Sequence, residues 1–359
     1  MTFFKSQISQ NFLKSRSHSF LLLGNILVSF GILLVTVGGS WDITNHLLNK
    51  PETFFSPPHA LIYFGVALSL IGAICSFIGW KNLQQFKIHY FFPLKIKLFG
   101  IALLVGAGPF DFLWHSNFGL DGFLSPPHLA LIVGMFLCSI GGMIGISRYL
   151  EINNFKNSFR SYLLILAILP VWLSGSGIIS SLSLPFSNTD YFNFNPEPIL
   201  AFLIATMAFP FLISMSMLLI FRLSHYGFGM MSILGCLFLL IYSFTAIVPN
   251  FAIFDSVLFY SLNLIPFVVS DVILLHKSKK SLIFVGGLLG SVFYMVYYPY
   301  VMYTFNEVLL GKLVSPSLIY FVYFELIQTV LMITVIPAII MGIFAVVISE
   351  KLSKKILMS

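Results

Sequence analysis

Aspartate and histidine residues recur along the chain in one order and at one spacing, Asp-x3-His-x12-His. The first copy consists of Asp42, His46 and His59, and the second, 69 residues later, of Asp111, His115 and His128. Residues four apart on a helix share a face, so a carboxylate and an imidazole can reach the same ion. Two imidazoles and one carboxylate suit copper, iron or zinc, and copper has the highest intrinsic affinity of these. The spacing predicts a transition-metal site, with copper favoured.

The last histidine of each copy ends a Ser-Pro-Pro-His sequence, Ser56 to His59 and Ser125 to His128. Serine followed by proline is typical of a helix start, so each histidine should project from a first turn. The positive end of the helix dipole disfavours imidazolium there, and neutral imidazole is the form that binds metals. Glu52 and Asp121 lie between the histidines and are candidates for further ligands or for hydrogen-bond acceptors that orient an imidazole.

A structural alternative explains the same residues without a metal. An Asp–His hydrogen bond could fasten a helical hairpin, and Pro-Pro could simply turn the chain. Two copies that both keep the carboxylate, the histidines and the intervening acid favour a functional site, because ionisable residues at membrane depth are costly.

The second copy, Asp111-Phe-Leu-Trp-His115 followed by Asp121 and Ser-Pro-Pro-His128, resembles the copper-site segment of the membrane C subunit of particulate methane and ammonia monooxygenases. The resemblance implies Asp111, His115 and His128 as copper ligands with Asp121 near the site. The internal repeat extends this implication to the first copy. Only this short segment carries the resemblance, and the motif is doubled here.

The elements that hold these residues must be transmembrane helices. Of the 359 residues 58% are hydrophobic and 9% charged, whereas soluble domains have about 25% charged residues. Apolar runs long enough to cross a bilayer follow one another along the chain. We expect one all-α transmembrane domain, 1–359, with about ten spans: 20–46, 58–80, 98–116, 127–148, 162–182, 198–220, 229–248, 255–275, 282–304 and 317–349. The motifs predict parallel two-helix repeats over 20–88 and 89–157, with degenerate copies in 158–359.

The charges predict how the chain is oriented in the cell membrane. Of 19 lysines and arginines, only Lys50 and Lys312 fall in loops on the motif side under this span assignment. The positive-inside rule therefore places both termini in the cytoplasm and the motifs at the outer face. The net charge of +7 is thus explained by topology, and no nucleic-acid partner is expected.

Three functions remain open at this stage. The first is a copper protein that is a subunit or relative of a copper-dependent membrane monooxygenase, with other membrane subunits as partners and a small apolar or uncharged substrate. The second is a metal transporter or delivery protein, for which Glu325 could lie further along the path. The third is a metal-free scaffold. The sequence leaves open whether the two motifs form one binuclear or two mononuclear sites.

Overall fold

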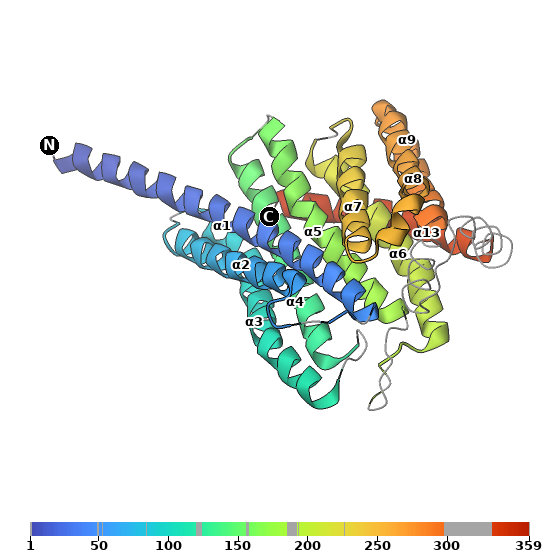
Figure 1. Cartoon of the computed structure of the whole chain (residues 1–359). Helices are drawn as coiled ribbons and strands as arrows, with labels where there is room; N and C mark the ends of the chain where they lie inside the picture. The colour runs from blue at the N-terminus through green and yellow to red at the C-terminus, as the bar shows by residue number, and fades with distance from the viewer. Residues whose placement is uncertain are drawn as a thin grey trace.

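The computed structural model describes residues 2–48, 50–51, 53–83, 85–119, 124–155, 158–184, 192, 194–225, 227–297 and 332–358. These residues form helices and no β-strand. Nine of the described helices are long and apolar enough to cross a membrane. The prediction of an all-helical fold with about ten long apolar helices is therefore confirmed for the described residues. Figure 1 shows how these helices are arranged.

The long helices run as follows: α1 (Thr2–Leu47), α2 (Pro57–Lys81), α3 (Lys87–Phe118), α4 (Pro126–Ile152), α5 (Ser158–Ser183), α6 (Pro198–Leu223), α7 (Met230–Ile247), α10 (Lys279–Leu288) with its continuation η4 (Leu289–Phe293), and α13 (Met332–Met358). The predicted Ser-Pro-Pro starts are correct, because α2 begins at Pro57 and α4 at Pro126. Each proline lies in the first turn, where a backbone N–H would have no acceptor within the helix, so its absence costs nothing.

Helices α1 and α2 pack as one hairpin and α3 and α4 as another, and α4 also lies against α1 (Figure 1). Glycines let the first two backbones approach closely, as is common between membrane helices. A Cβ added to Gly31 would lie 2.5 Å from the carbonyl oxygen of Gly65, and one added to Gly24 would lie 2.5 Å from the backbone nitrogen of Ser76. This tight hairpin brings the end of α1 beside the start of α2.

The third span begins earlier than the prediction of 98–116, because α3 starts at Lys87. Two basic residues interrupt the apolar run, but the structure accommodates them differently. Lys95 is exposed, whereas Lys97 is only 2% exposed and its ammonium donates to Oδ1 of Asn25 (2.5 Å) and to Oγ of Ser76 (2.9 Å). Lys97 is therefore a buried polar link between the two hairpins and not a loop residue.

The span predicted for 255–275 is broken into short helical segments: η1 (Phe251–Ser256), α8 (Val257–Ser261), η2 (Leu262–Leu264), α9 (Ile265–Ile273) and η3 (Leu274–His276). Pro266 cannot donate a backbone hydrogen bond into the preceding turn, which explains the break before α9. The buried carboxylate of Asp271 accepts hydrogen bonds from the backbone nitrogen (2.8 Å) and the hydroxyl (2.6 Å) of Ser232. It thereby compensates the positive end of α7.

The main hydrophobic core lies in the second half of the chain, among α5, α6, α7 and their neighbours. Trp172 stacks on Phe238 with ring centroids 3.7 Å apart. A polar contact ties the first hairpin to this core, because Oγ of Ser40 on α1 donates to Oγ1 of Thr245 on α7 over 3.0 Å. The end of α1 that carries the first motif is thus held from two sides.

The last two predicted spans are only partly described. Predicted span 282–304 corresponds to the helical segment Lys279–Tyr297, and α13 extends nine residues past the predicted end at 349. Glu325 lies outside the described residues, as do parts of the predicted degenerate copies.

Candidate metal centre

The first motif forms a compact triad where α1 ends and α2 begins. Asp42 and His46 lie one turn apart near the end of α1, and His59 lies in the first turn of α2. Nε2 of His46 is 3.4 Å from Oδ2 of Asp42, and Nε2 of His59 is 3.0 Å from Oδ1 of the same carboxylate. The three side chains are 15–21% exposed, so the triad is largely withdrawn from solvent but remains accessible.

The second motif forms a matching triad between α3 and α4. Asp111 and His115 lie near the end of α3, and His128 lies in the first turn of α4. Nε2 of each histidine is 3.4 Å from Oδ1 of Asp111. In both triads one ligand atom per residue can be chosen so that the three atoms lie within 4.8 Å of one another. The structure therefore brings together each predicted set of three ligands.

The Nδ1 atoms of two histidines make hydrogen bonds that fix the protonation of their Nε2 atoms, which face the carboxylates. Nδ1 of His59 lies 2.9 Å from the carbonyl oxygen of Thr53, and Nδ1 of His115 lies 2.8 Å from that of Gly119. A carbonyl can only accept, so each Nδ1 carries a proton. In a neutral imidazole Nε2 is then an acceptor. Two acceptors facing each other repel, unless a metal ion or a second proton lies between them.

The Asp–His distances also fit a bound cation, and so do two carboxylate oxygens that accept no well-oriented hydrogen bond from the described residues. A tetrahedral ion with bonds of about 2.0–2.1 Å holds neighbouring ligand atoms about 3.3 Å apart. Three of the four Asp–His contacts measure 3.4 Å, longer than charge-assisted N–H···O hydrogen bonds of about 2.7–2.9 Å. Oδ1 of Asp42 and of Asp111 is buried and accepts no hydrogen bond of good geometry from the described residues. A buried acceptor left in this state costs about 1–3 kcal/mol, which a bound cation would offset.

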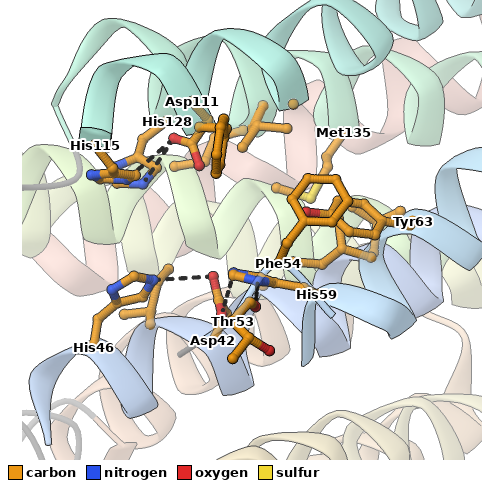
Figure 2. A pocket seen from close by; sticks show the side chains of 18 residues that line it. Asp42, His46, Thr53, Phe54, His59, Tyr63, Asp111, His115, His128 and Met135 are labelled. Atoms are coloured by element: carbon orange, nitrogen blue, oxygen red, sulfur yellow. Dashed lines mark hydrogen bonds and ion pairs between the residues drawn. The ribbon is translucent and has the colours of Figure 1, made fainter. Parts of the chain in front are cut away.

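Both triads open into one pocket with a volume of about 300 Å³. Figure 2 shows Asp111, His115 and His128 above this pocket and the first triad below it. The rings of His46 and His115 approach across it, with centroids 6.0 Å apart. None of the described residues that line the pocket is a lysine or an arginine. Among its described residues, the pocket therefore offers a cation six side chains that could serve as ligands and no lysine or arginine that would compete with it.

Two further predicted site residues, Glu52 and Asp121, lie outside the described residues. The four histidines outside the motifs lie elsewhere: His18 on α1, His89 near the start of α3, His225 shortly after α6 and His276 at the end of η3. None of these four lines the pocket.

Several lining residues were not predicted from the sequence. Tyr63 follows His59 by four residues, and Met135 follows His128 by seven, so each shares a helix face with its histidine. Helical spacing from His59 could have identified Tyr63, whereas the spacing of Met135 indicates a face shared with His128 but not that this face lines a pocket. Thr53 was also missed, because it contacts Nδ1 of His59 through its backbone carbonyl, which any residue could supply.

Fold and site define a class: a helical protein with long apolar helices and two Asp-His-His triads whose ligand atoms lie close enough together to hold a metal ion. The comparisons add no closer assignment, since no family model, curated protein or solved structure matches the chain.

Proposed function

We propose that this chain is a membrane metalloprotein that holds a transition metal, copper, in the two Asp-His-His triads near the outer membrane face. The observation that carries the proposal is the hydrogen bonding of His59 and His115. Their Nδ1 atoms face backbone carbonyls, so their Nε2 lone pairs are directed at carboxylate oxygens. Such outer hydrogen bonds are typical of histidines that bind metals.

Copper is preferred over zinc and iron for two reasons. Imidazole and carboxylate donors bind divalent copper more tightly than either alternative. The resemblance of the second motif to the C subunit of particulate monooxygenases points to the same metal. Copper held by two imidazoles and a carboxylate supplies one-electron chemistry and an open coordination position. On this basis we propose a relative or subunit of a copper-dependent membrane monooxygenase, with further membrane subunits as partners and a small uncharged substrate.

Transport of the metal is the second candidate, and the packing below the pocket argues against it. Leu131 and Met135 line the pocket and also pack on a buried apolar cluster made of Val28, Ile32, Ala73, Ile101, Leu104 and Cys138. Each member of that cluster is at most 4% exposed. A cation leaving the pocket toward the other membrane face would have to pass this apolar cluster and then the buried ammonium of Lys97, and both are costly for a positive charge. The described residues favour a binding site over a pathway.

A metal-free scaffold is the third candidate. Doubly protonated histidines would also satisfy the Asp–His contacts and would fasten each hairpin. The hairpins need no such lock in the described part of the chain, because the backbones of α1 and α2 already meet through glycines along their length. The triads therefore add little to helix packing and are better explained by a ligand.

The proposal is tested by the metal content of the full-length protein, purified in detergent, reconstituted with copper and freed of loose metal. Wild type is compared with the double variants His46→Ala/His59→Ala and His115→Ala/His128→Ala. The control, His89→Ala/His276→Ala, removes two histidines that do not line the pocket.

Stoichiometric copper in wild type and in the control, with loss in both triad variants, supports the proposal. Retention of zinc or iron instead of copper would correct the metal and keep the site. Equal and negligible metal in all four proteins would overturn the metalloprotein assignment.

A further inference from the structure

The two triads are parts of one cavity and not two separate surfaces. Residues at equivalent motif positions line it in pairs from the two hairpins: Gly39 and Gly108, Asp42 and Asp111, His46 and His115, His59 and His128. The paired side chains approach the same space from opposite sides (Figure 2). An ion bound by one triad would therefore face an ion bound by the other.

The separation of two such ions has an upper bound. The ring centroids of His46 and His115 are 6.0 Å apart. With metal–nitrogen bonds of about 2.0 Å, each ion lies roughly 3 Å from the centroid of its own imidazole ring. Two ions bound to these rings are therefore at most about 12 Å apart. Charges at such a distance across a pocket with largely apolar walls are only weakly screened.

Among the described lining residues, the charge balance of the pocket favours an anion. Two divalent ions bring four positive charges, whereas Asp42 and Asp111 contribute two negative charges and the histidines bind as neutral imidazoles. No other acidic side chain lines the pocket among the described residues. An uncompensated charge in such surroundings is costly, so a negatively charged ligand would be stabilised strongly.

The walls define how large this ligand can be. A pocket of about 300 Å³ lies at the lower end of the range for small-molecule sites. Phe54 and Phe112, with ring centroids 5.9 Å apart, lie along the lining together with aliphatic side chains. Besides two ions, such a space admits a ligand of only a few non-hydrogen atoms.

We propose that the two triads form one binuclear site, and that this site binds a small anion between its two divalent metal ions. The inference rests on the proposed function, because it requires that each triad holds a metal. It adds that the ions are magnetically and electrostatically coupled and that they share one exogenous ligand.

The test uses the full-length protein loaded with Cu(II), with azide as the probe anion. Wild type is expected to bind two copper ions per chain and to give a dipolar-broadened electron paramagnetic resonance spectrum. One azide per two copper ions should bind in a single step. Variants His46→Ala/His59→Ala and His115→Ala/His128→Ala should retain one copper each, show no broadening, and bind azide at least 10-fold more weakly.

Failure of the inference and failure of the proposed function give different results. Two copper ions whose spectrum equals the sum of the two variant spectra, with two equal and independent azide sites, would overturn the binuclear site alone. Absence of bound copper in wild type would overturn the metalloprotein assignment and the anion site with it.

Discussion

The imidazole rings of His46 and His115, which belong to different helical hairpins, lie with their centroids 6.0 Å apart and an interplanar angle of 31°. This proximity requires that the end of α1, which carries His46, lies close to the end of α3, which carries His115. Ser40 fixes the end of α1 on α7, while α4 packs against α1 and carries the second hairpin with it. Any change that separates the hairpins should therefore act on both triads.

Orientation of His128 provides the first prediction. Its Nδ1 lies 2.9 Å from Oγ of Ser125, so Ser125→Ala removes the group that fixes the ring. Metal affinity of the second triad should fall by about 10-fold or more, as is usual when such an outer partner is lost. Isothermal titration of the His46→Ala/His59→Ala background with Cu(II) measures this triad alone.

A matched control exists at the equivalent position of the other hairpin. Ser56 also precedes two prolines, but His59 uses the carbonyl of Thr53 and the Ser56 hydroxyl has no hydrogen-bond partner among the described residues. Ser56→Ala should leave the affinity of the first triad unchanged. Equal losses from both serine variants would show that the serines act through helix starts and not through the imidazoles.

Close packing of α1 on α2 provides the second prediction. Gly31→Val would place side-chain atoms into the backbone of Gly65, which should lower the free energy of unfolding by about 1–3 kcal/mol. Copper binding at the first triad should weaken too, because Asp42 and His59 come from different helices of this hairpin. Thermal unfolding in detergent with and without copper measures both effects.

Gly106 on α3 serves as the control for this experiment, since a Cβ there meets nothing within 4 Å. Gly106→Val should change the unfolding free energy by no more than about 0.5 kcal/mol. A comparable destabilisation by both substitutions would assign the effect to helix propensity and not to the hairpin contact.

The sequence predicted the long helices well because each is a run of apolar residues as long as a bilayer is thick. It predicted the triads because residues four apart must share a helix face, and because the pattern occurs twice. The early start of α3 was missed, since Lys95 and Lys97 interrupt the apolar run although Lys97 finds buried partners. Met135 could not be singled out among 13 methionines without knowing that its helix face lines a pocket.

The buried amine of Lys97 provides the third prediction. Lys97→Met keeps the length and the apolar stem but leaves Oδ1 of Asn25 and the hydroxyl of Ser76 without their donor. The free energy of unfolding should fall by about 1–3 kcal/mol, the cost of unsatisfied buried polar groups. Copper content should stay at the wild-type value, because 14 helical residues, about 21 Å, separate Lys97 from Asp111.

Lys95→Met, two residues earlier and exposed, is the control and should be nearly neutral. Loss of copper from Lys97→Met without loss of stability would contradict a structural role and would indicate long-range coupling to the metal pocket.

Sidedness provides the last prediction, because the positive-inside rule places the triads at the outer face. Phe55 and Asn82 flank α2 at opposite ends and are exposed, Phe55 by 76%. The 25 residues of α2 span about 37 Å, more than the hydrocarbon core of a bilayer, so these positions should lie on opposite sides. In intact cells a membrane-impermeant maleimide should label Phe55→Cys, and it should label Asn82→Cys only after permeabilisation. Wild type supplies the background of the native cysteines, and the reverse labelling pattern would place the pocket that the two triads line at the cytoplasmic face.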